Sequence, residues 1–238
     1  MIRRLPCLFL CLLPLPALQA ASPDWGGSLV LSSDNLMRGT SRSSSEPALA
    51  AELHAQFSSG WLGALWATTS RVRPSDPTTV DIAATLGYGA ALGDDWSLRG
   101  SFTHYESPWQ NPSGFYRYDE LTLDIRYRES LLLSASFSPD TSRFGSAFGP
   151  VWKRNAMAYE ATWQQPLSRS LRGHVGIGYY DLSDLFGRGY WYGSTGLAWS
   201  RGHWQLDAAY VIAGRRAQDL SYVGDGGRRG LFSIGYFF

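Results

Sequence analysis

Apolar and polar residues alternate with a period of two along most of the chain after its first 25 residues. In residues 204–212, Trp204, Leu206 and Tyr210 fall on one face, whereas Gln205 and Asp207 fall on the other. Successive side chains of a β-strand point to opposite faces, so this pattern predicts strands with one apolar and one polar face. The pattern recurs in twelve windows: 27–37, 48–57, 61–69, 80–88, 96–105, 118–127, 131–138, 156–164, 171–180, 190–199, 204–212 and 230–238.

The connections between these windows alternate in length. The long ones are about 38–47, 70–79, 106–117, 139–155, 181–189 and 213–229, and the short ones are 58–60, 89–95, 128–130, 165–170 and 200–203. Outer-membrane barrels have tight turns at their periplasmic end, long external loops and an even number of strands. A soluble β-sandwich gives no reason for such an alternation. The sequence therefore predicts an all-β fold, a transmembrane antiparallel up-and-down β-barrel of about twelve strands over residues 21–238.

Aromatic residues gather at the turn-side ends of the predicted strands, in phase with the apolar face. Tyr and Trp rings favour the headgroup level of a membrane. The alternative is that they form the core of a soluble sandwich, but their position at one end of the strands favours a lipid interface. The predicted interface residues are Phe57, Trp61, Tyr88, Trp96, Tyr127, Trp163, Trp199, Trp204 and Phe238. The last window ends on an aromatic residue and resembles the terminal signature that the barrel-assembly machinery reads, so this machinery is an expected partner.

Charged residues fall on the polar face, which a barrel would enclose. An Arg or Lys facing lipid at mid-bilayer costs roughly 2–4 kcal/mol, and the phase places no charged residue of windows two to twelve there. Two interpretations of the enclosed charges stay open. They form ion pairs between strands that brace a nearly filled lumen, or they line a narrow pore that filters small solutes. The candidate pore-lining residues are Asp34, Arg38, Glu52, Asp81, Arg99, Glu120, Asp124, Arg126, Glu160, Arg172 and Asp207.

The longer loops carry a small excess of basic residues. Bidentate pairing of arginines with lipopolysaccharide phosphates explains this excess, and an anion-attracting vestibule is the alternative. We expect loops 139–155 and 213–229 to restrict the mouth of the barrel. If Asp34 and Arg38 pair, they pin the first strand to its loop.

The composition and the N-terminus agree with an exported membrane protein. The chain has 238 residues, of which 44% are hydrophobic, 14% aromatic and only 17% charged, and its formal net charge of +1 argues against nucleic-acid binding. Residues 1–20 have a basic start and an apolar run over 5–18, which predicts a cleaved signal peptide. Cys7 and Cys11 both lie within it, so the exported chain carries no disulfide. We therefore expect the outer membrane of a Gram-negative bacterium as the location.

Catalysis receives little support from the sequence. His54 and His174 are predicted to point inward near the turn side, without a local Ser/His/acid pattern. Metal-ligand spacing and phosphate-binding glycine loops are lacking, so we predict no enzyme activity, no metal and no cofactor. A barrel enzyme and a non-conducting structural or surface-binding barrel are the alternatives to a channel.

The segment 33–42 carries a Ser-Asp-x3-Arg-Gly-x-Ser core, followed by Pro-Ala in 46–49 and by Ser-Gly and an aromatic residue in 59–61. This sequence resembles the opening of the TorF family of porin-like proteins. Residues 118–120 and 137–140 and the Gly-Tyr-Tyr-Asp of 178–181 fit as well, so the resemblance covers most of the chain after residue 20. It implies an outer-membrane barrel that acts as a channel, with no established substrate and no catalytic residues. We predict a porin-like channel for passive passage of small hydrophilic solutes, surrounded by outer-membrane lipid and lipopolysaccharide.

Overall fold

The computed structural model describes residues 22–71, 74–107, 117–144, 151–220 and 227–238. The signal peptide predicted for residues 1–20 lies outside this part of the chain. Within it, strands make up nearly all of the regular structure, and the helices are short. None of the described helices has the length and apolar character needed to cross a membrane.

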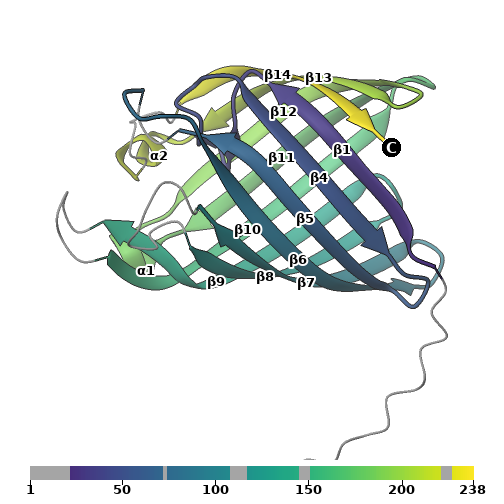
Figure 1. Cartoon of the computed structure of the whole chain (residues 1–238), viewed down its shortest axis with the longest axis horizontal. Helices are drawn as coiled ribbons and strands as arrows, with labels where there is room; N and C mark the ends of the chain where they lie inside the picture. The colour runs from purple at the N-terminus through teal and green to yellow at the C-terminus, as the bar shows by residue number, and fades with distance from the viewer. Residues whose placement is uncertain (1–21, 72–73, 108–116, 145–150, 221–226) are drawn as a thin grey trace, which may run out of the picture.

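Twelve strands close into one antiparallel barrel, which confirms the predicted fold class (Figure 1). Each strand pairs with its neighbour in the barrel, and β1 closes the ring by pairing Ser28–Ser32 with residues 233–237 of β14. The barrel strands are β1 (Asp24–Ser32), β4 (Ala48–Gln56), β5 (Trp61–Ser70), β6 (Thr79–Leu92), β7 (Trp96–Glu106), β8 (Tyr118–Tyr127), β9 (Leu131–Phe144), β10 (Val151–Pro166), β11 (Leu171–Asp181), β12 (Tyr190–Arg201), β13 (Trp204–Ala213) and β14 (Arg228–Phe237).

The two faces of the wall have the character that the period of two requires. On the outer face, Leu86 and Ile177 are each 57% exposed and Leu123 is 48% exposed. On the inner face, Asp81 and Asp124 are only 7% exposed. An apolar exterior around a polar interior inverts the arrangement of a water-soluble protein and suits a wall surrounded by hydrocarbon.

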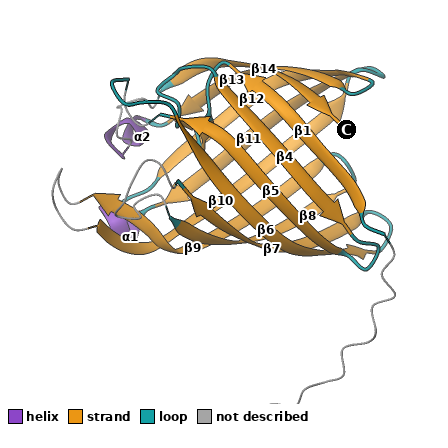
Figure 2. Cartoon of the chain, in the orientation of Figure 1, coloured by secondary structure: helices purple, strands orange, loops and turns teal. Residues whose placement is uncertain are grey.

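Tight turns lie at one end of the barrel and the longer connections at the other. The turn between β4 and β5 is closed by a hydrogen bond from the Gly60 N–H to the Phe57 carbonyl oxygen at 2.9 Å, and Gly60 has a φ of +94°. At the opposite end lie α1 (Ser183–Phe186) and α2 (Arg215–Leu220), as Figure 2 shows. Because the number of strands is even, the start of β1 and the end of β14 both lie at the end of the barrel that has the tight turns.

The prediction of a first strand over residues 27–37 is wrong for its second half. β1 ends at Ser32, and the chain then forms a separate two-stranded sheet, β2 (Leu36–Met37) and β3 (Thr40–Ser41). Arg38 and Gly39 between them have φ values of +50° and +78°. Two consecutive positive φ values make the type of two-residue turn that closes a hairpin tightly.

The loop predicted over 139–155 is largely barrel wall. β9 continues to Phe144 and β10 begins at Val151, with an irregular register between Arg154 and Ala156. The expectation that this loop restricts the mouth is therefore wrong for its described residues, because they extend the wall instead. Residues 145–150 lie outside the described part.

Candidate functional site: the barrel lumen

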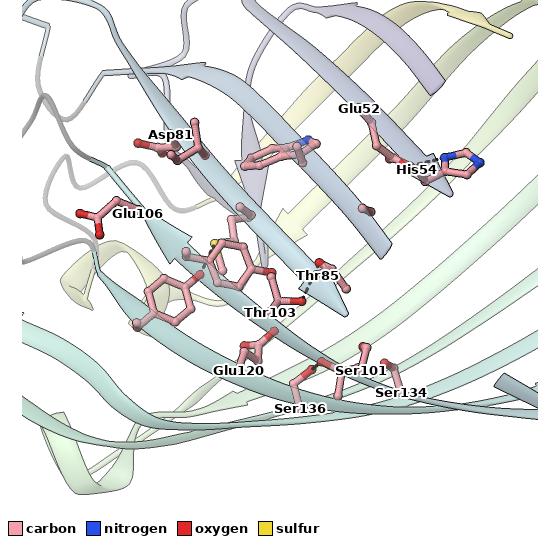
Figure 3. Close-up of a pocket in the computed structure, with 18 of the residues that line it drawn as sticks. Glu52, His54, Asp81, Thr85, Ser101, Thr103, Glu106, Glu120, Ser134 and Ser136 are labelled. Carbon is pink, nitrogen blue, oxygen red and sulfur yellow. Dashed lines mark hydrogen bonds and ion pairs between the residues drawn. The ribbon is translucent and has the colours of Figure 1, made fainter. Parts of the chain in front are cut away.

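A cavity of about 760 Å³ occupies one side of the lumen (Figure 3). It extends from Gln56 and Leu62 at the turn end to Glu106 at the loop end of β7, so it spans the height of the wall. Its polar lining comes from β4 to β10 and from the connection after β1. Those polar residues are Asn35, Arg38, Arg42, Glu52, His54, Gln56, Asp81, Thr85, Arg99, Ser101, Thr103, Tyr105, Glu106, Ser107, Tyr118, Glu120, Thr122, Asp124, Ser134, Ser136 and Glu160.

Residues 33–47, which we call the inner hairpin, reach across the lumen. The Nη2 atom of Arg38 lies 2.6 Å from Oε2 of Glu120 on β8, and its guanidinium carbon lies 4.5 Å from the centre of the Tyr180 ring on β11. β8 and β11 are far from β1 and β4 around the closed sheet. A loop that begins at one wall is thus held at the other, and it narrows the lumen.

The base of the inner hairpin is held by Asp34. Its Oδ1 accepts hydrogen bonds from the hydroxyls of Ser41 at 2.6 Å and Ser43 at 2.8 Å, and its Oδ2 lies 2.6 Å from Nη1 of Arg229 on β14. Asp34 therefore does not pair with Arg38, and the pairing considered from the sequence is wrong. Each residue instead joins the inner hairpin to a different part of the wall.

Two further arginines of the cavity are bound to carboxylates. Arg99 and Asp124 are directly opposite each other in β7 and β8, and Nε and Nη2 of Arg99 donate to the same Asp124 oxygen at 2.9 and 2.6 Å. Arg42 of the inner hairpin lies 3.1 Å from Asp81, which also accepts a hydrogen bond from Ser107. These contacts satisfy buried carboxylates and tie neighbouring strands together, as the bracing interpretation requires.

Two cavity carboxylates have no arginine or lysine partner among the described residues. Glu160 accepts a hydrogen bond from the Tyr192 hydroxyl at 2.6 Å, and Glu52 lies 2.9 Å from Nδ1 of His54. Both point into the space enclosed by the barrel, and Figure 3 shows Glu52 and His54 side by side on β4.

The remaining candidate pore residues lie elsewhere on the inner face. Arg126 and Arg172 are close to the turn-side ends of β8 and β11, and within the described chain neither forms an ion pair. Asp207 on β13 lies 3.7 Å from His174 on β11. These three residues are not part of the cavity lining given by the described residues.

The opposite side of the lumen is filled at its loop end, which the sequence did not reveal. Tyr190 of β12 is 5% exposed and packs with Leu182 and Leu185 around α1 and with Ala217 of α2. Tyr180 and Tyr192 pack against this cluster. The only sequence signal is the spacing of three between Leu182 and Leu185, which suits one helical turn inside a predicted loop.

The predicted interface aromatics all lie at the turn-side ends of the strands or in the adjoining turns and termini. Trp61 and Tyr88 are each 47% exposed on neighbouring strands, with ring centres 5.4 Å apart. Two residues at this level were missed: Trp25, which is 63% exposed, and Tyr236, whose ring lies 5.1 Å from that of Trp204.

Two basic side chains at the loop end of β7 to β10 are paired with acidic ones. Arg117 lies 2.5 Å from Glu106, and Lys153 lies 3.1 Å from Asp140. The hydrogen bond to Glu106 raises the pKa of Arg117 above its ordinary value. At these positions the charges cancel locally, so they do not add to an anion-attracting vestibule. Contact of the loop arginines with lipopolysaccharide stays a prediction.

In the described part of the chain, the inward histidines have carboxylate neighbours but no nucleophile bonded to their rings. Neither His54 nor His174 is hydrogen-bonded through its ring to a Ser or Thr side chain in the described chain. A His oriented by a carboxylate acts as a general base only when a proton donor lies within its reach. The same part of the structure contains no group of three or more His, Cys, Asp or Glu side chains placed to hold a metal ion.

Comparison with known proteins gives structural but no sequence relatives. No family model matches the chain, and no curated protein matches its sequence. The resemblance to the TorF family therefore stays a prediction. Among solved structures, the NanC porin aligns with a TM-score of 0.58 at 10% identity over 89% of this chain and 98% of its own. The KdgM porin aligns with a TM-score of 0.56 at 10% identity over 90% and 99%. An outer-membrane channel from Pseudomonas putida F1 gives 0.52 at 12% identity over 93% and 98%. At such identities the similarity is one of fold, and the fold is that of an outer-membrane β-barrel.

Proposed function

We propose that the protein is an outer-membrane channel through which small hydrophilic solutes pass, and that the inner hairpin forms its constriction. The observation that carries this proposal is the polar cavity that spans the wall from Gln56 to Glu106. A barrel that served only as a brace would gain nothing from leaving this volume open beside a packed sector. Solved barrels of the same architecture include porins and a channel, which supports the proposal.

The inner hairpin sets the width of the proposed pore. It lies in the lumen and contributes Asn35, Arg38 and Arg42 to the cavity lining, so solutes would pass between it and the wall formed by β4 to β8. Exclusion by size would then depend on the hairpin, and discrimination by charge would depend on the side chains opposite it.

A non-conducting structural barrel is the second candidate, and the many ion pairs inside the lumen favour it. Planar-bilayer recording on the purified chain separates the two. Wild-type protein should conduct, and a variant with residues 35–42 replaced by a Gly-Ser linker of equal length should show larger steps. A change in gel mobility on heating would verify that both chains are folded. If both fold and insert but neither conducts, the channel is refuted and the bracing role stands.

The enzyme alternative has its own test in the same preparations. We propose that the protein is not an enzyme, because the rings of His54 and His174 have no Ser or Thr hydroxyl partner among the residues that the structure describes. Wild type should therefore not hydrolyse phospholipid or lipopolysaccharide, and neither should His54→Ala or His174→Ala. Turnover by wild type that either substitution abolishes would contradict this proposal.

A further inference from the structure

We infer that the pore prefers cations and that Glu52 and Glu160 determine this preference. The inference rests on the proposed channel function and adds the charge class of its solutes. It begins from the pairing of the lumen charges, since a paired charge and a free charge act differently on a passing ion. An ion pair presents only a dipole to an ion several ångströms away, whereas an unpaired carboxylate presents a full negative charge.

The positive charges of the cavity are all committed. The guanidinium of Arg38 is bound to Glu120, and that of Arg99 donates twice to Asp124. Arg42 also lies within ion-pair distance of its carboxylate partner on β6. Each arginine that lines the cavity in the described chain thus has its charge offset by a neighbouring carboxylate, so this lining offers an anion no uncompensated cation.

Two negative charges of the described cavity lining are left over. Glu160 has the Tyr192 hydroxyl as its partner, and Glu52 has the imidazole of His54, so neither carboxylate is bound by an arginine or a lysine of the described chain. Each lies near the middle of its strand, β10 and β4 respectively. The space between the inner hairpin and the turn end of the barrel therefore carries an uncompensated negative charge along the path of the proposed pore.

The two inward arginines without carboxylate partners do not cancel this charge. Arg126 and Arg172 lie close to the turn-side ends of their strands, and neither belongs to the cavity lining that the structure describes. Charges in the open entrance are surrounded by water and screened within about 10 Å at 0.1 M salt. The carboxylates of Glu52 and Glu160 instead lie within the enclosed cavity, on the path of the proposed pore.

The size of the effect follows from the Coulomb energy of a single charge. A unit charge about 5 Å from a monovalent ion changes the local ion concentration by roughly fourfold, even with the dielectric constant of water. The same charge raises the local cation concentration and lowers the local anion concentration, each by this factor. Removing one of the two carboxylates should therefore lower the cation-to-anion permeability ratio by up to about sixteenfold. Removing both should leave the pore with little selectivity.

The test is the reversal potential of single channels in a potassium chloride gradient at low salt. Wild type should favour potassium, Glu160→Gln and Glu52→Gln should each reduce the permeability ratio, and the double variant should reduce it further. Glu160→Asp keeps the charge and should retain most of the preference. Glu129→Gln, in the tight turn between β8 and β9, is the matched control and should behave as wild type.

The outcomes separate this inference from the proposed function. Conductance with anion preference, or with a ratio that the double variant leaves unchanged, would overturn the cation preference and leave the channel standing. Folded protein that never conducts would overturn the channel and the inference together. A shift in Glu129→Gln as large as that in Glu160→Gln would also overturn the assignment to the lumen carboxylates.

Discussion

Removing the contact between Arg38 and Glu120 should both weaken the barrel and widen the pore. In Arg38→Met the side chain keeps an unbranched apolar stem but is shorter and loses the charge that crosses the lumen. The inner hairpin then has no ionic attachment to β8, although Asp34 still holds its base. We expect larger and noisier single-channel currents than in wild type, since the tip of the hairpin is free to leave the constriction.

The cost in stability can be estimated from burial. The side chains of Arg38 and Glu120 are only 8% and 7% exposed, so the carboxylate left behind is buried without a counter-charge. Removing one partner of a buried pair costs about 3–5 kcal/mol, whereas replacing both by neutral groups is often close to neutral. Arg38→Met should therefore lower the free energy of unfolding by about 3–5 kcal/mol. The double variant Arg38→Met/Glu120→Gln should recover most of that loss.

The double-mutant cycle consists of wild type, Arg38→Met, Glu120→Gln and the double variant. Urea unfolding in lipid vesicles, followed by tryptophan fluorescence, measures the stability of each. The reasoning is refuted if Arg38→Met unfolds at the same urea concentration as wild type and conducts identically. It is also refuted if the free energy of unfolding of the double variant lies below that of Arg38→Met by as much as Glu120→Gln alone costs. That result would mean that the two side chains act independently rather than as a pair.

Two other predictions concern the wall and the turns. Leu86→Arg places a charge on the lipid face and should lower the unfolding free energy by about 2–4 kcal/mol. The adjacent Thr85→Arg points into the lumen and should cost less. Urea unfolding in vesicles measures both losses, and equal losses would contradict the assigned faces. Gly93→Ala should cost about 1–2 kcal/mol because φ is +78° there. Gly60→Ala should cost more by the same assay, because φ is +94° and its Cβ would collide with the Gly89 carbonyl oxygen. An equally stable Gly60→Ala would contradict that contact.

The strands could be predicted because the alternation of apolar and polar residues lies within each strand's own sequence. The alternation in residues 204–212, for example, needs no knowledge of any neighbour, and β13 indeed covers Trp204–Ala213. The same phase correctly placed Arg99 and Asp124 on the inner face, opposite each other. A one-residue error would have sent both to lipid, so the cost of a charge in hydrocarbon is what makes the phase reliable.

The inner hairpin could not be predicted, because its structure depends on contacts between residues far apart in the sequence. Arg38 is 82 positions from Glu120, and Arg229 is 195 positions from Asp34. The first predicted strand runs on to residue 37, and residues 38–47 have no period of two or of 3.6, so the sequence predicts a longer strand and a loop in place of the hairpin. The Ser and Asp side chains that bend this loop bond to one another, which is a local alternative to continuing the ladder of β1.

The interpretations left open by the sequence, bracing and filtering, describe different residues of the same lumen. Arg38, Arg99 and their carboxylate partners hold strands and hairpin together, and the loss of one partner would leave a buried charge. Glu52 and Glu160 have no such role, because a tyrosine hydroxyl and an imidazole would bond to a neutral amide as well. In the described cavity lining, all three arginines are bound to carboxylates and two carboxylates are in excess. Such a lining can be rigid and still discriminate by charge. Stability should follow the paired residues and ion selectivity the unpaired ones, so each group can be changed with little effect on the other property.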